Sequence, residues 1–331
     1  MKDVAIIGAG PVGLFAVFEA GMLGLKTAVI DGLPAVGGQC RALYAEKPIY
    51  DIPAYPSILA GELVDRLWEQ AQPFDPELHL GTAVDTVERV ADGFVLGLNN
   101  GQSVAAKSVL IAAGGGAFSP NRPPLDGIEQ FEGTSVHYFV DRVERFRGKD
   151  VVIAGGGDSA VDWAVLLSDV ASSVSVVHRR PQFRAAPESV AKLQARVSEG
   201  KIRLCVPGQL SALSGSNGVL SSVSVAYEDG THEDIKADIL LPFFGLMPSL
   251  GSIESWGLNL DKKTIKVDPS TCATNIKGVY AIGDIAAYPR KLKLIMTGFA
   301  EGAQAAHAIY EFLNPDKPLH FVHSTDKGVK A

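Results

Sequence analysis

Cysteine is scarce in this sequence, and its three cysteines do not form a recognisable pair. Cys40, Cys205 and Cys272 lie far apart in the 331 residues. Neither a CxxC motif nor a metal-binding spacing is present. We therefore expect a protein of a reducing, cytoplasmic setting, with no metal site.

Long apolar runs and an excess of positive charge are missing as well. No uninterrupted apolar run approaches the ~18 residues that a membrane span needs, and the first residues show no signal-peptide pattern. The formal net charge is −7, which argues against general affinity for nucleic acids or anionic membranes. We expect neither as a partner.

Glycine, in contrast, is abundant at 35 residues, and some of these glycines form two similar turns. The first turn follows the apolar run 4–7 and contains Gly8, Gly10 and Gly13 in a GxGxxG spacing. Glycines at this spacing let backbone N–H groups and a helix N-terminus approach a pyrophosphate. Asp31 ends the next apolar stretch, where a carboxylate accepts hydrogen bonds from ribose hydroxyls. The segment predicts a dinucleotide-binding strand, turn and helix.

The second glycine turn lies in the sequence VVIAGGGDSA and has a different residue at the position equivalent to Asp31. Gly155, Gly157 and Ala160 give a GxGxxA spacing, and His178 ends the next apolar stretch. The cations that follow are Arg179, Arg180 and Arg184. Cations at this place suit the 2′-phosphate of NADP. The alternative is a solvated basic turn, but the position within the unit favours NADP.

The sequence around the two turns has the same organisation twice. A hairpin-rich stretch follows each unit, at 78–114 and 202–245, and ends in an apolar strand. Passages rich in proline and glycine at 114–127 and 242–251 predict that the second unit is inserted into the first.

These features predict an α/β protein with two Rossmann-like, three-layer ββα dinucleotide-binding domains. One domain would comprise 1–116 and 246–331, with 314–331 as a C-terminal extension, and the other would comprise 117–245. In the returning part of the first domain, 279–284 predicts a strand and 298–313 a helix.

With these motifs in place, the chain resembles the two-dinucleotide-binding flavoprotein superfamily, and within it most closely thioredoxin reductase, over nearly its full length. The matching segments are GAGPVG (8–13), GGQ (37–39), AAG (112–114), GGGDSA (155–160), HRR…FRA (178–185) and AIGD (281–284). The resemblance implies FAD in the first domain and NADPH/NADP+ in the inserted one.

The resemblance also assigns cofactor-binding residues. Those implied for FAD are Gly8, Gly10, Pro11, Gly13, Asp31, Gly38, Gln39, Tyr44, Val84, Ala113, Phe118 and Asp284, the last at the ribityl chain. Those implied for NADP are Gly155, Gly157, Asp158, Ser159, Ala160, His178, Arg179, Arg180 and Arg184.

The chain departs from the thioredoxin reductases at their redox cysteines. Those enzymes carry a CxxC at the start of the inserted domain, where this chain reads TSVHYF at 134–139. The related lipoamide dehydrogenases place a cysteine pair after the GG turn, where this chain has Cys40 without a partner four or five residues later. Because neither disulfide relay can operate, electrons would have to leave directly from the flavin.

A branch without these cysteines is known, and the chain is similar to it: the thioredoxin-reductase-like ferredoxin:NADP+ reductases. The marks of this branch are Tyr50 in PIYDIPAYP and a C-terminal extension with His323, Ser324 and Thr325. The resemblance implies that Tyr50 and His323 stack on opposite faces of the isoalloxazine ring as catalytic residues, with Ser324 and Thr325 also at FAD. Without the resemblance, Tyr50 is equally an ordinary loop aromatic and His323 a solvent-facing tail residue.

The expected function is electron transfer between NADPH and ferredoxin or flavodoxin through FAD, by a homodimer. Because ferredoxins are acidic, the basic stretch 290–293 is a candidate docking site. Two alternatives stay open: an NADPH-dependent flavin reductase with a quinone or other small acceptor, and a non-catalytic module that senses the redox state of FAD and NADP.

Overall fold

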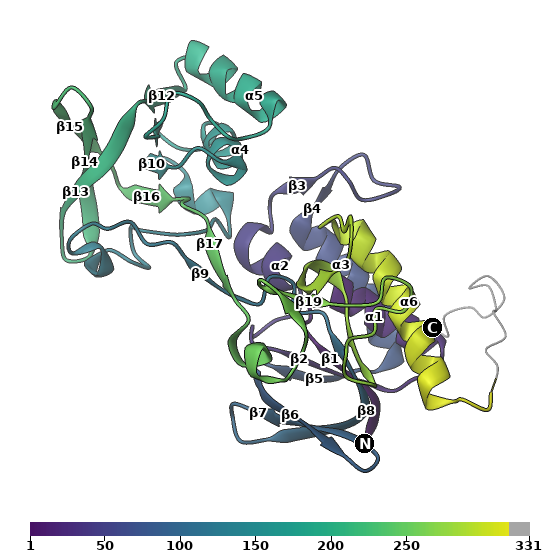
Figure 1. The fold of residues 1–331 in the computed structure, drawn as a ribbon. Helices are drawn as coiled ribbons and strands as arrows, with labels where there is room; N and C mark the ends of the chain where they lie inside the picture. Colours follow the sequence, from purple (N-terminus) through teal and green to yellow (C-terminus); the bar gives the residue numbers. More distant parts are fainter. Residues whose placement is uncertain (318–331) are drawn as a thin grey trace. The chain divides into compact units, whose positions relative to one another are not determined.

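The computed structural model describes residues 1–317, without the side chains of Phe118, Ser119, Leu246 and Pro248. The chain forms two compact units (Figure 1). The first unit is Met1–Phe118 together with the residues from Pro248 onward, and the second is Ser119–Met247. The chain passes between them through β9 (Ala117–Pro120) and β17 (Leu246–Ser249), which pair with each other.

The first unit is built on a largely parallel sheet with the strand order β5-β2-β1-β8-β7-β6, in which β20 also pairs with β8. β1, β2, β5, β8 and β20 run parallel, whereas β6 and β7 form an antiparallel hairpin beside β8. The strands are β1 (Lys2–Ile7), β2 (Thr27–Asp31), β5 (Glu77–Leu80), β6 (Val84–Val90), β7 (Gly93–Leu98), β8 (Ser103–Ile111) and β20 (Val279–Ala281).

Alternating residues of β1 fill two different cores, which gives the unit its layers. Val4 and Ile6 pack with residues of the helices α1 (Pro11–Met22) and α6 (Ile295–Leu313). Ala5 and Ile7 pack on the other face, against Phe94 of the β6–β7 hairpin and its neighbours. Because both faces are covered, the central strands are apolar throughout, as the sequence indicates.

The remaining elements of the first unit surround this framework. Figure 1 shows α1 between α6 and α3 (Ala60–Ala71), and both helices contact α1. The other elements are α2 (Gly38–Tyr44), β3 (Pro48–Ile49), β4 (Ile58–Leu59), β18 (Leu260–Asp261), β19 (Thr264–Lys266), β21 (Ala286–Ala287) and the 3₁₀ turns η1 (Gln72–Phe74), η4 (Gly251–Ser255) and η5 (Gly283–Ile285).

The second unit repeats the strand, turn and helix arrangement. Its parallel sheet has the order β12-β11-β10-β16, and a three-stranded antiparallel sheet, β13-β14-β15, packs on it through residues such as Val223 and Val225. The elements are β10 (Asp150–Ala154), β11 (Ser173–Val177), β12 (Ile202–Cys205), β13 (Gly208–Ser216), β14 (Val219–Tyr227), β15 (His232–Lys236), β16 (Ile239–Pro242), α4 (Asp158–Leu167), α5 (Pro187–Ser198), η2 (Ile128–Gln130) and η3 (Val143–Phe146).

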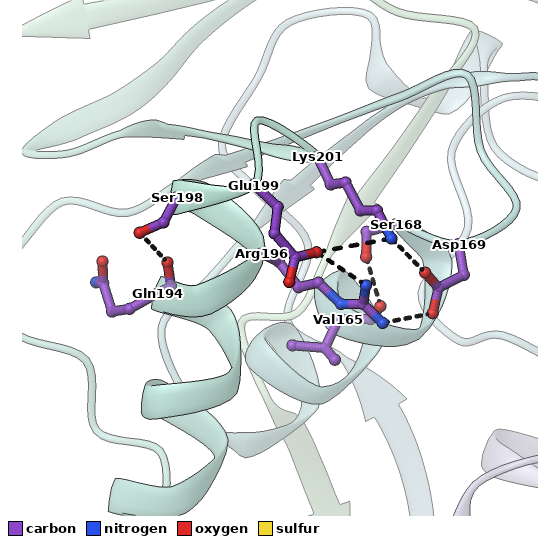
Figure 2. Close-up of polar contacts among 8 residues, drawn as sticks. All are labelled: Val165, Ser168, Asp169, Gln194, Arg196, Ser198, Glu199 and Lys201. Carbon is purple, nitrogen blue, oxygen red and sulfur yellow. Dashed lines mark hydrogen bonds and ion pairs between the residues drawn. The ribbon is translucent and has the colours of Figure 1, made fainter.

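Charged side chains join the ends of α4 and α5 at the surface (Figure 2). Arg196 of α5 contacts Asp169 at 2.8 Å and Glu199 at 3.1 Å, and Lys201 reaches the same two carboxylates. Because these groups are solvated, each pair contributes at most about 1 kcal/mol.

The α/β class predicted from the sequence is confirmed, and one predicted element is wrong in detail. The segment 279–284 is not a single strand, because β20 ends at Ala281 and η5 begins at Gly283. Gly283 has a φ of +73°, which does not continue a strand. Among residues 1–317, no helix has the length and apolar character to cross a membrane.

Candidate nucleotide-binding sites

The first glycine turn, Gly8–Gly13, is packed so closely that only glycine fits two of its positions. Gly8 has a φ of +113°, and a Cβ on it would lie 2.4 Å from the carbonyl oxygen of Ala112. A Cβ on Gly13 would lie 2.0 Å from the carbonyl oxygen of Gly8. Gly10 is different, because the atom nearest to a Cβ on it would be the Cα of Gly38, at 4.0 Å. The turn is therefore tightly packed at Gly8 and Gly13, whereas a Cβ at Gly10 would make only an ordinary contact with Gly38.

The helix that starts at this turn has an N-terminus without a side-chain cap. Gly10 is the N-cap residue of α1 and Pro11 occupies its first turn, where the missing N–H of proline has no cost. Uncapped N–H groups and the positive end of the helix dipole favour an anion. This arrangement suits a pyrophosphate.

The Asp31 carboxylate lies beside the first glycine turn. It accepts the N–H of Ala9 at 2.6 Å and the N–H of Leu33 at 2.8 Å. Burial raises the pKa of Asp31, and the two N–H donors oppose that shift. The carboxylate is thus fixed in orientation next to the place where the helix N-terminus would bind a pyrophosphate.

The GGQ segment forms a second wall on the first glycine turn. The N–H of Gly37 donates to the carbonyl of Ala9 at 2.8 Å. A Cβ on Gly38, whose φ is +54°, would lie 2.9 Å from the Cα of Gly10. The side chain of Gln39 lies near Gly114, whose Cβ position is 3.9 Å from Nε2. The three glycine-bearing segments of the first unit therefore meet in one place, as their assignment to one cofactor requires.

Tyr44 and Asp284 share a neighbourhood with Cys40. The Tyr44 hydroxyl lies 3.5 Å from the Cys40 sulfur. Burial raises the pKa of both groups, and the charge of Asp284 adds to the rise in each. The Asp284 charge therefore acts on both Cys40 and Tyr44, two side chains of α2.

The remaining residues predicted at FAD are placed less favourably or lie outside the described part of the chain. The side chain of Val84 is buried in the core, so only the backbone of this residue could contact a ligand. Ala113 follows β8 beside the Gly8 position. Phe118 is in β9, and its side chain is not described. Tyr50 follows β3 and is 66% exposed. His323, Ser324 and Thr325 lie outside residues 1–317.

A buried acid that the sequence analysis did not identify lies beside Gly283, the residue before Asp284. Glu301 of α6 is 2% exposed, and its Oε2 accepts the N–H of Gly283 at 2.7 Å. Its Oε1 accepts the hydroxyl of Tyr288 at 2.6 Å and pairs with the ammonium of Lys291. The only signal in the sequence is an acid among the small and apolar residues of 298–306.

The Lys291 contact corrects the docking site predicted at 290–293. The Lys291 side chain is only 6% exposed and is bound to Glu301. It is therefore unavailable to a partner, which leaves Arg290 and Lys293 as the exposed cations of that stretch.

The second glycine turn, Gly155–Ala160, is similar to the first but has room for a side-chain methyl group at its third small residue. Gly155 has a φ of +150°, and a Cβ on it would lie 2.7 Å from the carbonyl oxygen of Phe243. Gly157 has open space around its Cβ position. Ala160 is fully buried beneath the turn, so a methyl group is accommodated where the first turn has Gly13. Helix α4 begins with the exposed pair Asp158 and Ser159, and Asp158 accepts the N–H of Ala186 at 2.8 Å.

His178 is part of the protein interior rather than of an exposed cationic cluster. It is 7% exposed, and its ring stacks on that of Phe183 with centroids 5.2 Å apart. Nε2 lies 3.2 Å from the carbonyl oxygen of Gln182, and a Cβ on Gly156 would lie 2.3 Å from the ring. Burial lowers the pKa of His178, and the nearby arginines add to this effect. The neutral ring supports the glycine turn.

The cations beside the second glycine turn are the three arginines that follow His178. Arg179, Arg180 and Arg184 are exposed, and none of them forms an ion pair within residues 1–317. The N–H of Arg184 donates to the carbonyl of Gly156 at 2.7 Å, which folds the arginine-bearing loop back onto the turn. This gives the charge and position that a 2′-phosphate would need.

The cysteines show no redox pair. All three are buried free thiols, and Cys40 and Cys205 belong to different units. In the segment 134–139, Ser135 is buried and its hydroxyl accepts the N–H of Leu220 at 3.1 Å, a structural contact. Among residues 1–317, no cluster of three or more histidine, cysteine, aspartate or glutamate side chains could hold a metal ion.

Comparison with protein families and curated proteins agrees with this geometry. Residues 2–307 match the family model described as pyridine nucleotide-disulphide oxidoreductase. A ferredoxin–NADP reductase from Paramagnetospirillum magneticum is 59% identical over 328 residues, covering 99% of this chain and 97% of that protein. Another from Rhodospirillum rubrum is 58% identical, covering 99% of this chain and 96% of that protein.

Solved structures share the fold. A thioredoxin reductase from Lactococcus lactis is similar with a TM-score of 0.78 at 26% identity, covering 95% of this chain and all (100%) of that one. A thioredoxin reductase from T. acidophilum has a TM-score of 0.79 at 24% identity, covering 94% and 98% of the two chains. These are two-domain flavoprotein folds of the kind expected from the sequence.

Proposed function

Because the chain belongs to the pyridine nucleotide-disulphide oxidoreductase family, and within it to the ferredoxin–NADP reductases, we propose that it transfers electrons between NADPH and ferredoxin or flavodoxin through FAD. The observation that carries the proposal is this full-length similarity, to which the two glycine turns add their own support. One turn lies beside a carboxylate and the other beside three exposed arginines.

We assign FAD to the first unit, whose limits Phe118 and Pro248 each differ by two residues from the limits 116 and 246 expected from the sequence. The uncapped start of α1 would hold the pyrophosphate, and Asp31 would accept hydrogen bonds from a ribose. Asp284, whose charge acts on Tyr44, would contact the ribityl chain.

We assign NADPH to the second unit, Ser119–Met247, for which the sequence predicted 117–245. The open position at Gly157 and the start of α4 would bind its pyrophosphate. Arg179, Arg180 and Arg184 would bind the 2′-phosphate, while His178 holds the turn from below. The uncharged His178 ring leaves the selection of NADP over NAD to the arginines.

The proposed route of the electrons depends on the residues that stand where thioredoxin reductases and lipoamide dehydrogenases carry their redox cysteines. Bound FAD would accept a hydride from NADPH and pass electrons singly to the acceptor. No cysteine occurs at 134–139, and Cys40 is a buried thiol hydrogen-bonded to Tyr44. The protein residues would therefore bind and orient the two cofactors and exclude water from them. They would not relay electrons themselves. Tyr50 and His323 would cover the two faces of the isoalloxazine ring, with Ser324 and Thr325 alongside.

The partners are part of the same proposal. Ferredoxin or flavodoxin would dock near the exposed Arg290 and Lys293, which are close in sequence to the Asp284 turn. The working form would be a cytoplasmic homodimer.

Steady-state turnover with a panel of acceptors tests the function. We expect the purified protein to carry FAD and to reduce cytochrome c with NADPH only when ferredoxin or flavodoxin is added. Faster turnover with a quinone than with ferredoxin would overturn the proposed acceptor. Bound nucleotides without any turnover would instead indicate a redox-sensing module.

A further inference from the structure

Glu301 has three polar contacts, in each of which its carboxyl group is the acceptor. It accepts hydrogen bonds from the N–H of Gly283 and the hydroxyl of Tyr288, and it pairs with Lys291. All three partners lie within 283–291, the segment that leads from η5 to α6. A charge buried to this degree is stable only when it is paired and hydrogen-bonded, as here.

The contact with Gly283 completes η5. Gly283 is the first residue of this 3₁₀ turn, and the N-cap residue Ile282 provides no side-chain hydrogen bond. The Gly283 N–H would be unsatisfied without the Glu301 carboxylate. Since Asp284 is the next residue, the carboxylate fixes the backbone from which the Asp284 side chain extends.

Helix α6 also reaches the first glycine turn. A Cβ on Gly298 would lie 2.3 Å from the Cγ2 of Val12, and a Cβ on Gly283 would lie 3.4 Å from its Cγ1. Val12 is in the first turn of α1, so α1, η5 and α6 meet around this one side chain. Glu301 is three residues after Gly298 and therefore lies on the same side of α6.

We propose that Glu301 is a positioning residue for bound FAD. Through the Gly283 N–H it holds Asp284 at a fixed distance from the Gly8–Gly13 turn, and Lys291 and Tyr288 hold the carboxylate in place. The inference rests on the proposed binding of FAD to the first unit.

Two neutral double variants separate the hydrogen bond from the charge. Changing only one member of the Lys291–Glu301 pair leaves a buried, uncompensated charge, which would destabilise the whole protein. E301Q/K291M removes both charges but keeps an acceptor for the Gly283 N–H, whereas E301M/K291M removes the acceptor too. Ile309→Ala is the control, because Ile309 is 1% exposed in the same helix and packs in the core with the β-sheet.

The readouts are the dissociation constant of FAD from apo-protein, by flavin fluorescence, and hydrogen–deuterium exchange of apo-protein peptides covering 279–287. We expect E301Q/K291M to bind FAD within about threefold of the parent. E301M/K291M should bind on the order of tenfold more weakly and exchange faster at 279–287. Ile309→Ala should lower the melting temperature without that loss of FAD affinity.

Parent-like affinity and exchange in folded E301M/K291M would overturn the inference, as would an equal loss of affinity in Ile309→Ala. If E301M/K291M does not fold, E301Q/K291M decides the question: parent-like FAD affinity supports the inference, and a tenfold loss with the acceptor retained refutes it. A parent protein that binds no FAD would refute the proposed function instead, so the two failures are distinguishable.

Discussion

The two glycine turns share a scaffold but use the residue at the end of the second strand in different ways. After β2, the Asp31 carboxylate accepts an N–H from the first turn at Ala9. After β11, the His178 ring lies beneath the second turn against Gly156 and stacks on Phe183. One residue is a hydrogen-bonding group beside the ligand position, and the other is a packing element.

This difference shows that equivalent positions in repeated units do not have equivalent roles. In the first unit, the side chain at the strand end itself presents charge. In the second unit, the charge is presented by the residues after it, and the hydrogen bond from Arg184 to Gly156 brings that loop back to the turn. A single-residue comparison of Asp31 with His178 therefore identifies the strand end at which the two units differ in charge, but in the second unit it does not identify the charged groups.

The largest expected effect comes from the third small residue of each turn. Gly13→Ala places a Cβ 2.0 Å from a backbone oxygen, so the backbone has to move. We expect the free energy of unfolding to fall by about 1–3 kcal/mol. We also expect the purified variant to carry no bound flavin. The matched change Ala160→Gly in the second turn should cost only about 1 kcal/mol and leave flavin content unchanged.

Thermal unfolding and the ratio of flavin to protein absorbance measure both effects. If Gly13→Ala kept the parent melting temperature and full flavin content, the close approach of Gly13 to the Gly8 carbonyl would not be required for stability or flavin binding.

The backbone of both turns could be predicted from sequence because it depends on neighbouring residues. Glycine spacing, the preceding apolar strand and the following helix are all local, and so the positions of Asp31 and His178 followed from them. The burial of Lys291 could not be predicted, because a basic run at 290–293 has the composition of a solvated surface. Its burial arises from Glu301, which α6 brings back to η5.

The role of His178 escaped prediction for a similar reason. Its ring packs against Gly156 and Phe183, burial lowers its pKa, and those contacts exist only in the folded chain. The strand predicted at 279–284 failed at Gly283, where a positive φ and the hydrogen bond to Glu301 start a 3₁₀ turn.

The next largest effect concerns the arginines of the second unit. If Arg179 and Arg180 bind the 2′-phosphate as proposed, Arg179→Ala and Arg180→Ala should each remove a charge-assisted hydrogen bond and lower kcat/KM for NADPH by about tenfold to a hundredfold. The kcat/KM for NADH should stay unchanged. Steady-state kinetics with both coenzymes gives the comparison.

Arg196→Ala is the matched control, since Arg196 is an arginine of the same unit that is engaged in the surface ion pairs of Figure 2. An equal loss with NADH in the Arg179 or Arg180 variants, or a similar loss in Arg196→Ala, would show that the arginines do not discriminate the phosphate.

The smallest effect is a difference in how stability depends on pH at the two strand ends. Burial lowers the pKa of His178 from its ordinary 6.5, so below that pH the unfolded chain binds a proton that the folded chain does not. The contribution of His178 to stability should therefore fall as the pH drops below about 6.5, until the folded-state pKa is reached. The hydrogen bond to the Gln182 carbonyl opposes this shift, and the charges of Arg184, Arg180 and Arg179 reinforce it.

Asp31 should behave in the opposite way, because burial raises the pKa of its carboxyl above the ordinary 3.8. The folded chain then takes up the proton first, and the contribution of Asp31 to stability rises as the pH falls through the folded-state pKa. Urea unfolding from pH 7.5 to 4 should show that His178→Phe reduces the loss of stability on acidification, while Asp31→Asn increases it. His137, whose pKa burial also lowers, is common to all these proteins, so the difference from the parent isolates each position. If both variants shifted the pH dependence in the same direction, the opposite roles of the two strand ends would be contradicted.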